Sequence, residues 1–338
     1  MKTSIALLNY NGKHFLEQFL PSVIKYSTQS DTEICVIDNA STDNSVAFLQ
    51  ENFSQVKIVV LDKNYGFAGG YNRGLQHIEA EYFVLLNTDV EVTENWLNAP
   101  IAFLDKNPDV AACQPKILSY SDKTKFEHAG AAGGFIDYLG YPFCRGRVLN
   151  TLETDNGQYD DTIDVFWATG ACLFIRSKDF RQAGGFDDNF FAHQEEIDLC
   201  WRLRRSGRRL ACVPQSAVYH VGGGTLNKEN PHKTYLNYRN NLLMLHKNLP
   251  AKTLRKILFI RFFLDYLSAA AMILSGERGN ARAVRKARKD FRKLRKQYVG
   301  AEDFSPEIVE ILPKSMIFNY YVLGKKTYEK LNYKPVKY

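Results

Sequence analysis

The sequence predicts an α/β fold in which a mostly parallel sheet is flanked by helices and followed by a helical C-terminal extension. Two observations support this prediction. Short apolar segments alternate with helix-like segments up to about residue 90, and basic charge rises abruptly in the last third of the chain. Strands that alternate with helices are typical of a doubly wound sheet, in which neighbouring strands run parallel.

Three strands and two helices are expected in the first part of the chain. The expected strands are 3–8, 33–37 and 57–61, and the expected helices are 14–26 and 46–52. Polar or glycine residues end the strands, and Ser41 or Asp43 can cap the second helix. The third strand leads into a glycine-rich segment that opens another helix. This order is typical of one half of a nucleotide-binding domain.

Residues 82–91 change abruptly from apolar to polar. The segment begins as an unbroken apolar run, which is typical of a strand buried on both faces of a sheet. It ends in Asn87, Thr88 and Asp89, with Glu91 close behind. Ligands of open α/β sheets bind beyond the carboxyl ends of the strands, where a carboxylate can hold a divalent cation on phosphate oxygens. A surface turn started by Asp89 explains the same residues.

The glycine-rich segment is neither of the two common phosphate-binding motifs. Its glycines are Gly66, Gly69, Gly70 and Gly74. This spacing differs from the dinucleotide fingerprint, and no Gly-Lys-Ser/Thr follows as in a P-loop. Either the backbone approaches a nucleotide closely, with Asn64, Asn72 and Arg73 as donors, or the glycines allow tight packing of strand on helix. Asp38, at the end of the second strand, either reads a nucleoside or caps a helix.

A second group of acids stands at the start of a predicted helix. A buried strand is expected over 164–176, opened by a turn of small residues that includes Gly170. Glu195, Glu196 and Asp198 follow within one helical turn. They form either a solvated first turn favoured by the helix dipole or a site with a general base for an incoming hydroxyl.

Composition limits the class of protein. The chain has 338 residues, of which 45% are hydrophobic and 24% charged, enough for one large domain and an appendage. Its six cysteines contain no CxxC pair, which favours reduced thiols in the cytosol and gives no zinc motif. The N-terminal apolar run is shorter than a signal peptide requires.

The basic charge is confined to one segment. Residues 251–300 contain 14 Lys or Arg and 3 Asp or Glu, whereas the first 250 residues are net acidic. A localised anionic partner is therefore expected. The apolar segment 257–274 contains Arg261 and Asp265, which are costly in the middle of a membrane span.

We expect an interfacial helix at 257–274, followed by a basic helix at 281–298, both on an anionic membrane surface. The alternatives are a short span in which Arg261 pairs with Asp265, or a helical appendage that packs on the catalytic domain or on a second subunit of a homodimer. No nucleic-acid-reading motif accompanies the charge, so no nucleic acid partner is expected.

Five motifs occur in order along the chain. They are Leu7–Gly12, Val36–Ser45, Asn64–Gly69, Leu85–Asp89 and Gly185–Arg202. Together they resemble the family 2 glycosyltransferases, in particular the bacterial rhamnosyltransferase-like branch, over about residues 3–240. The resemblance implies the GT-A fold, a nucleotide-sugar donor, a divalent metal (Mg²⁺ or Mn²⁺) and inversion at the anomeric carbon. We expect a catalytic domain at 1–240 and a helical, basic, membrane-associating region at 241–338.

The same resemblance assigns residues to the donor site. It implies that Asp38 contacts the base and that Asn9 lines the same pocket. Residues expected to close around the nucleotide sugar are Asn64, Gly66, Gly69, Asn72, Asn87 and Thr88. Trp167 and Gly170 are further candidates, although a buried tryptophan usually belongs to the core.

Metal binding is assigned to Asp89, the last residue of the element that matches the family's Asp-x-Asp. The first acid of that element is Asn87 here, so one charged ligand instead of two reaches the metal. His220 stands where relatives place a histidine near the diphosphate. It is either a further ligand or a structural histidine at a turn.

The family's base is the aspartate of a Glu-Asp pair, and the matching position here is Glu196. Glu195 stays a second candidate because the register of the pair is open. A single carboxylate that deprotonates the acceptor hydroxyl is the chemistry that inversion requires.

The predicted function is therefore that of an inverting, metal-dependent hexosyltransferase. It would use a dTDP- or UDP-linked sugar and a glycan or lipid-linked acceptor in surface polysaccharide synthesis, at the cytoplasmic face of the cell membrane. A nucleotidyltransferase is one alternative, but it ordinarily has a basic glycine-rich loop that residues 9–12 lack. A non-catalytic membrane-associated partner of a glycan assembly complex is the other, and Asn87 and Glu196 keep it open.

Overall fold

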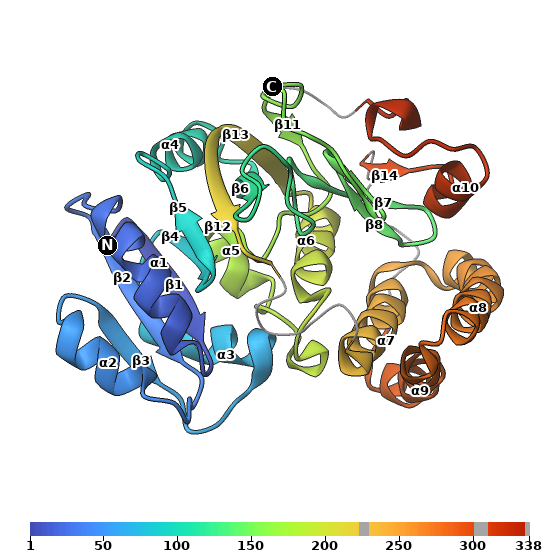
Figure 1. Cartoon of the computed structure of the whole chain (residues 1–338), viewed down its shortest axis with the longest axis horizontal. Coiled ribbons are helices and arrows are strands. Elements are labelled where there is room, and N and C mark those ends of the chain that lie inside the picture. Colours follow the sequence, from blue (N-terminus) through green and yellow to red (C-terminus); the bar gives the residue numbers. More distant parts are fainter. Residues whose placement is uncertain (223–229, 301–309, 335–338) are drawn as a thin grey trace.

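The structure, a computed structural model, describes residues 1–222, 230–300 and 310–334 (Figure 1). The main sheet has the strand order β11-β13-β6-β12-β4-β1-β2-β3, and β5 pairs with β13. Its strands are β1 (Thr3–Asn9), β2 (Thr32–Asp38), β3 (Lys57–Val60), β4 (Tyr82–Asn87), β5 (Val90–Val92), β6 (Val110–Ser119), β11 (Ile163–Asp164), β12 (Cys172–Arg176) and β13 (Arg209–His220).

Helices cover both faces of this sheet. They are α1 (Lys13–Lys25), α2 (Ser45–Asn52), α3 (Gly66–Gly74), α4 (Asn98–Lys106), α5 (Ser177–Gln182) and α6 (Glu195–Arg205), with the short turns η1 (Leu75–His77) and η2 (Asp188–Phe190). On β1, Ile5 and Leu7 pack into the core with α1 and α4, whereas Ala6 packs into the core with α3 and α6. Burial on both faces explains why the strand reads as one apolar run.

The predicted α/β architecture is confirmed, including the three strands before residue 62 and the strand before Asn87. Strands β3, β2, β1 and β4 are adjacent and parallel. In their register Asn9 lies opposite Asp38 and Leu8 lies opposite Asn87. The ends of β1, β2 and β4 therefore meet at one edge of the sheet.

The strand predicted over 164–176 forms only in its second half. Strand β12 runs antiparallel to β4 and β6, which makes the sheet mixed. Before β12 the backbone turns to other partners. Phe166 N–H (2.9 Å) and Trp167 N–H (3.1 Å) donate to the Gly134 carbonyl of the second sheet, and Thr169 N–H donates to Gln114 Oε1 (3.0 Å).

A second sheet has the order β10-β9-β8-β7-β14. Its strands are β7 (Gly134–Asp137), β8 (Pro142–Cys144), β9 (Arg147–Val148), β10 (Thr151–Leu152) and β14 (Ile311–Leu312). Strand β14, two residues long, lies within the region predicted as helical and is an exception to that prediction. Asp137 accepts from Met316 N–H (2.8 Å) and so ties α10 (Met316–Tyr321) to β7. The turn η4 (Glu329–Leu331) follows.

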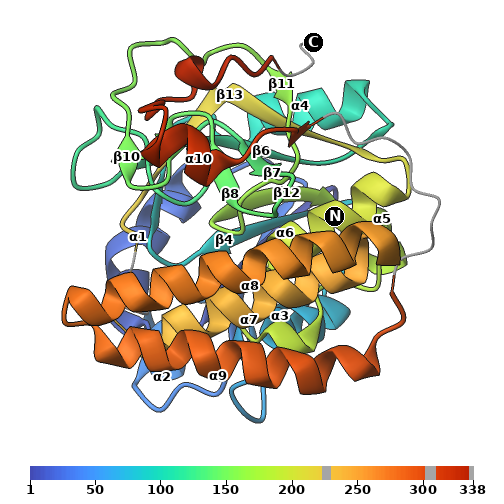
Figure 2. The same ribbon diagram turned by 90° about the vertical axis from the view of Figure 1, so that its right-hand side faces the viewer.

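The helical extension consists of α7 (Pro231–Asn248), α8 (Ala251–Leu274) and α9 (Arg278–Leu294), which run side by side (Figure 2), and ends in η3 (Arg295–Gln297). Helix α7 crosses the predicted boundary at 240/241, and its residues 242–245 join the core of the sheet domain. Within the ranges that the structure describes, α8 alone is long and apolar enough to cross a membrane.

Candidate active site

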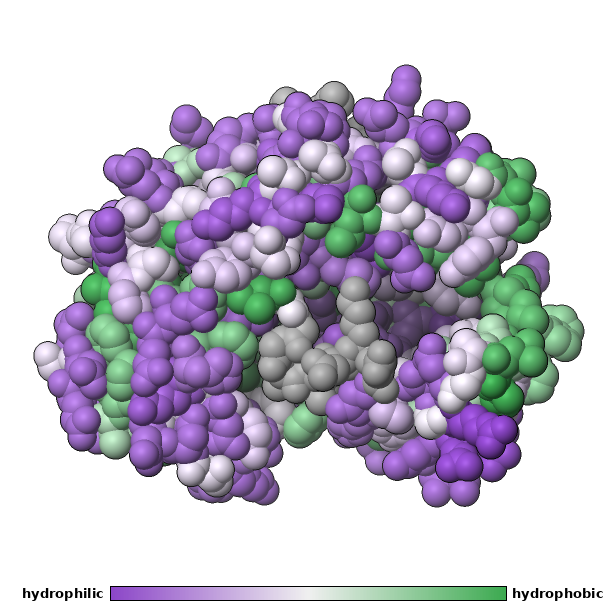
Figure 3. All heavy atoms as spheres, viewed as in Figure 1, coloured by the Kyte–Doolittle hydropathy of each residue, from purple (hydrophilic) through white to green (hydrophobic). Residues whose placement is uncertain are grey.

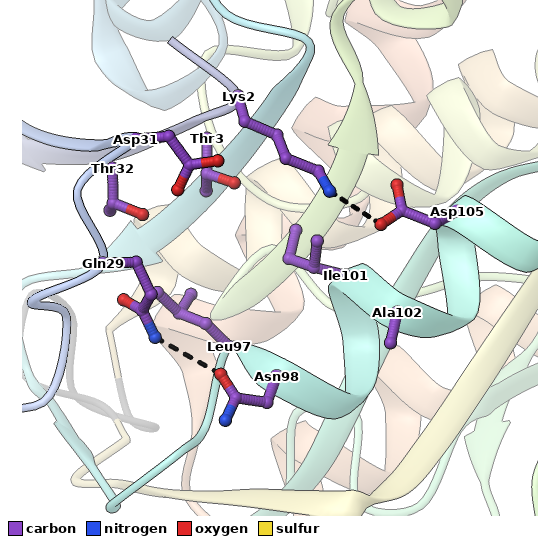
Figure 4. A pocket seen from close by; sticks show the side chains of 10 residues that line it. All are labelled: Lys2, Thr3, Gln29, Asp31, Thr32, Leu97, Asn98, Ile101, Ala102 and Asp105. Carbon is purple, nitrogen blue, oxygen red and sulfur yellow. Dashed lines mark hydrogen bonds and ion pairs between the residues drawn. The ribbon is translucent and has the colours of Figure 1, made fainter.

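Polar side chains gather where four strands of the main sheet end. Asn9, Asp38, Asn87 and His220 are the last residues of β1, β2, β4 and β13. This is the edge at which ligands of α/β sheets bind. A cavity of about 290 Å³ lies instead where β1 and β2 begin, and Lys2 reaches Asp105 across it (2.8 Å; Figure 4). This cavity therefore lies at the opposite edge of the sheet from Asn9, Asp38, Asn87 and His220, and is not part of the candidate site.

Asp89, His220 and Glu127 form a nearly buried row. His220 Nε2 is 3.2 Å from Asp89 Oδ1, and His220 Nδ1 is 3.3 Å from Glu127 Oε2. Burial lowers the pKa of His220, but hydrogen bonds to the two carboxylates outweigh this and raise it to about 10. Asn87 Nδ2 lies 3.4 Å from His220 Nε2. Sequence reasoning left Glu127 without a role.

The donor set suits a divalent cation that also binds phosphate. Neighbouring ligands of an octahedral ion at about 2.1 Å are separated by about 3 Å. The 3.2 Å between Asp89 Oδ1 and His220 Nε2 is close to this edge. Because histidine binds a metal only as the neutral imidazole, a cation here would have to displace the proton that the two carboxylates hold on His220. No three His, Cys, Asp or Glu side chains converge on one point in residues 1–222, 230–300 and 310–334. A cation here would therefore take its remaining ligands from the substrate and water, as Mg²⁺ commonly does.

Asp38 is fully buried at the end of β2. Its Oδ2 accepts from Asn9 Nδ2 (2.9 Å), and its Oδ1 accepts from Ser41 N–H (2.8 Å). Asn9 Oδ1 is buried without a hydrogen-bond partner among the described atoms. The structure thus brings Asn9 and Asp38 together as predicted, with Asp38 holding the loop. Its contact with a nucleoside stays a prediction.

Asn39 organises the entry to α3. Its Nδ2 donates to Asn64 Oδ1 (3.0 Å) and to the Gly66 carbonyl (3.0 Å), and its Oδ1 accepts from Tyr65 N–H (3.0 Å). Asn64 Oδ1 also accepts from Gly66 N–H (2.8 Å). Sequence reasoning missed Asn39, although it lies next to Asp38 in the same motif.

The side-chain amide of Asn72 forms hydrogen bonds to the segment before α6. Its Nδ2 donates to the Phe186 carbonyl and to Asp188 Oδ1 (both 2.7 Å), and its Oδ1 accepts from Phe186 N–H (2.9 Å). Gly69 gives close packing, since a Cβ there would lie 2.9 Å from Tyr65 Cβ. These contacts differ from the nucleotide contacts predicted for Asn72 and Gly69.

Glu195 and Glu196 open α6, and one oxygen of each carboxyl is buried without a partner in the described part of the chain. Burial raises the pKa of Glu196 to about 7. Burial and the neighbouring Glu196 raise the pKa of Glu195 well above its usual range. A Cβ on Gly170 would lie 3.3 Å from the Phe67 ring and 3.7 Å from Glu196 Cβ, so Gly170 packs between Phe67 and the start of α6. Such pKa shifts are typical of acid–base groups.

The loop before these acids is strained. Phe191, His193 and Gln194 have φ values of +64°, +70° and +72°. Non-glycine residues adopt this region at a cost and only where neighbours enforce it. The Phe191 carbonyl accepts from Phe67 N–H (2.6 Å) and Ala68 N–H (3.2 Å) at the start of α3. A Cβ on Gly66 would lie 2.5 Å from the Phe191 ring.

Asn240 on α7 holds the other side of this loop. The residue is fully buried, and its Nδ2 donates to three backbone carbonyls at 2.7–2.9 Å, those of Phe190, Ala192 and His193. Asn241 Nδ2 donates to Gln194 Oε1 (3.1 Å). Asn240 is thus a positioning residue for Glu195 and Glu196. In the sequence, the only indication of this role is that two asparagines, Asn240 and Asn241, stand next to each other within a predicted helix.

Trp167 belongs to the core and not to the sugar site. It is 3% exposed, its Nε1 donates to the Phe135 carbonyl (3.0 Å), and it fills the space above Gly134. Its prediction as a sugar-binding residue is corrected on this ground, because a ring enclosed by the second sheet has no free face for a sugar.

Comparison with known proteins now decides the family. The family model described as "Glycosyl transferase family 2" matches residues 4–184. The chain belongs to glycosyl transferase family 2. Rhamnosyltransferase WbbL of Escherichia coli is 42% identical over 166 residues, 46% of this chain and 61% of that protein. An N-acetylglucosaminyl-diphospho-decaprenol L-rhamnosyltransferase of Mycobacterium tuberculosis is 25% identical over 64% of this chain and 75% of that protein.

The chain also matches the O-antigen biosynthesis protein RfbC of Myxococcus xanthus at 26% identity, but spans only 17% of its length. Among solved structures, GalNAc-T7 with UDP, GalNAc and Mn²⁺ has a TM-score of 0.58 at 16% identity, covering 96% of this chain and 57% of that one. Mannosyltransferase PcManGT from Pyrobaculum calidifontis with GDP-Man and Mn²⁺ has a TM-score of 0.52 at 14% identity, covering 87% and 83%. The GT-A fold and the rhamnosyltransferase-like branch are therefore confirmed.

Proposed function

We propose that this glycosyltransferase transfers a hexose, with inversion, from a dTDP- or UDP-linked donor to a glycan or lipid-linked acceptor in surface polysaccharide synthesis. The observation that carries the proposal is Glu196, a carboxyl with a pKa of about 7 at the start of α6 in a family 2 domain. A general base acts best when its pKa lies near the working pH.

Glu196 takes the proton of the acceptor hydroxyl. The acceptor oxygen then forms a bond to the anomeric carbon from the side opposite the diphosphate, and the bond from that carbon to the phosphate oxygen breaks with its electron pair. The configuration of the sugar therefore inverts. Asn240 fixes the loop that orients the carboxylate.

Asp89 and His220 would hold a divalent cation next to the diphosphate of the donor. Such a cation, Mg²⁺ or Mn²⁺, supplies positive charge for the departing diphosphate. Structures related by fold contain Mn²⁺ with a nucleotide or nucleotide sugar, which supports this assignment.

The acceptor class is supported by the names of relatives. One relative is named for transfer of L-rhamnose to N-acetylglucosaminyl-diphospho-decaprenol, which carries a polyprenol lipid. Another is named for O-antigen biosynthesis. We accordingly place this enzyme at the cytoplasmic face of the cell membrane as a peripheral protein.

The test is a donor screen with purified full-length protein. Binding and hydrolysis of UDP-, dTDP- and GDP-sugars, rhamnosyl donors first, are measured with Mg²⁺ or Mn²⁺. Asp89→Ala is expected to lose metal-dependent binding, and Glu196→Gln to keep binding but lose about 10²–10⁴-fold in turnover. Exposed Glu94 provides the control, Glu94→Gln. Absence of nucleotide-sugar binding with either metal would contradict the proposal.

A further inference from the structure

Helix α8 has two unlike faces. The residues buried against the protein recur every three or four positions: Leu254, Ile257, Arg261, Asp265 and Ala269. The rest of the helix exposes large apolar side chains. These form the strip of Phe259, Ile260, Phe262, Phe263, Leu267, Ile273 and Leu274, in which Phe259 and Leu267 are both 68% exposed. Figure 3 shows hydrophobic residues gathered on the side of the molecule where α8 lies.

Helix α10 adds a second apolar group on the same side. Its end and the residues after it expose Phe318, Tyr321, Val322 and Leu323. Figures 1 and 2 both place α10 beside α8. Two elements that lie beside each other therefore both expose apolar side chains. Exposed apolar surface of this kind marks a protein or membrane contact.

Basic side chains border the α8 strip. Helix α9 packs along α8, and its outer face exposes Arg278, Arg282, Arg285, Lys286, Lys289, Arg292 and Lys293. Further exposed cations precede the strip at Lys252, Arg255 and Lys256. An apolar helix face flanked by cations matches an anionic bilayer, in which acyl chains accept the apolar groups and headgroups meet the charges.

The buried face of α8 shows that the helix lies on the protein and does not leave it to span a bilayer. Asp265 is fully buried between Arg261 (Nε to Oδ1, 3.2 Å) and Arg288 of α9. Arg261 Nη1 also donates to the Leu139 carbonyl (2.9 Å) and to Asn241 Oδ1 (2.6 Å). A spanning α8 would lose these partners and carry two charges into the hydrocarbon.

The same bonds connect the strip to the catalytic loop. Arg261 bonds to Asn241, and Asn241 bonds to Gln194, directly before Glu195. The buried face of α8 is therefore joined to the segment that carries Glu195 and Glu196.

We propose that the α8 strip and α10 dock in the plane of an anionic lipid bilayer, with the cations of α9 against the headgroups. This inference deepens the proposed function, on which it rests for the lipid-linked acceptor, but the docking surface is argued from α8, α9 and α10 alone.

Co-sedimentation of the full-length protein with vesicles tests the proposal. Vesicles of phosphatidylcholine are compared with equimolar phosphatidylcholine and phosphatidylglycerol, at low and high salt. The wild type is expected to bind the anionic vesicles, more weakly as salt rises. Combined Phe259→Ser, Phe263→Ser and Leu267→Ser should weaken binding roughly tenfold or more, and combined Arg282→Gln, Lys286→Gln and Lys289→Gln on the order of a hundredfold.

Val60→Ser, at an exposed apolar residue of β3, is the control and should bind like the wild type. Two results would overturn the proposal: no binding to anionic vesicles, or a dimer in solution that the α8 triple variant dissociates, which would make the strip a subunit interface. Donor hydrolysis is measured on the same preparations. Donor binding is measured there as well. Donor binding without vesicle binding overturns the docking surface alone, whereas vesicle binding without binding of any nucleotide sugar overturns the proposed function alone.

Discussion

Burial of Glu196 suits its carboxyl group to act as a base, but ionisation of the same buried group lowers the stability of the folded protein. Folding raises the pKa of its carboxyl group from 4.5 to about 7 because the group loses contact with water at the start of α6. One pKa unit corresponds to about 1.4 kcal/mol. Ionised Glu196 therefore destabilises the folded state by at most about 3 kcal/mol, and partial exposure of the side chain reduces this to about 1–3 kcal/mol.

The direction with pH follows from proton binding. The folded protein holds the Glu196 proton more tightly than the unfolded chain, so its contribution to stability is complete below pH 4.5 and is lost as pH rises through about 7. Glutamine cannot ionise. Glu196→Gln is therefore expected to be about 1–3 kcal/mol more stable than the wild type at pH 8 and to show only about a quarter of that gain at pH 5, while turnover falls about 10²–10⁴-fold.

Urea unfolding followed by tryptophan fluorescence at pH 5 and pH 8 measures the free energy of unfolding of both proteins. Exposed Glu94 again supplies the control, and Glu94→Gln should match the wild type at both pH values. Equal stability of Glu196→Gln and the wild type at pH 8 would refute the argument that burial sets this pKa. A gain of the same size at both pH values would refute it as well.

Three further substitutions test the positions around the base. Asn240→Ala removes the donor to three carbonyls and is expected to lower kcat about tenfold or more and stability by about 1–3 kcal/mol; unchanged steady-state kinetics would contradict its positioning role. Asp265→Asn leaves Arg261 and Arg288 buried without their counter-charge, and should cost about 3–5 kcal/mol in urea unfolding; a loss below about 1 kcal/mol would contradict this. Gly66→Ala forces a methyl group against Phe191 at a φ of +71°, so stability should fall by more than about 1 kcal/mol and nucleotide binding by calorimetry should weaken; wild-type binding would contradict it.

Much of the donor side could be predicted from the sequence because its information is local. Strands β1, β2 and β4 are buried on both faces, so each appears as an apolar run that stops at a polar residue. Once such strands are parallel neighbours, their last residues must meet at one edge. Asn9, Asp38 and Asn87 follow from this rule and were found.

Other contacts depend on how distant segments pack, and no local pattern reports them. Glu127 meets His220 because the loop after β6 folds back over the end of β13. Asn240 meets the loop before Glu195 because α7 packs against α6. In each case the sequence shows a polar residue and a turn or helix, but not the partner.

The same limit explains the errors. The segment 164–176 has the apolar content of one strand, yet Phe166 and Trp167 donate backbone hydrogen bonds to Gly134 of the second sheet, and only β12 continues in the main sheet. The sequence does not distinguish a tryptophan that stacks on a sugar from one in the core. The packing of Trp167 against Gly134 of the second sheet shows that it belongs to the core. Residues after 310 contain no strong strand signal, because β14 is two residues long.

The family, the order of the strands and helices up to about residue 90, and the residue types at the ends of the central strands could be predicted from the sequence alone. Tertiary structure alone decided which polar residues touch, that Glu195 and Glu196 follow a strained loop held from both sides, and that α8 buries Arg261 and Asp265 against the protein while exposing its aromatic face. The physical reason is that periodicity in a sequence reports how polarity is distributed around an element. The neighbour that covers each face, and hence the pKa and role of a buried charge, is set by contacts between residues far apart in the chain.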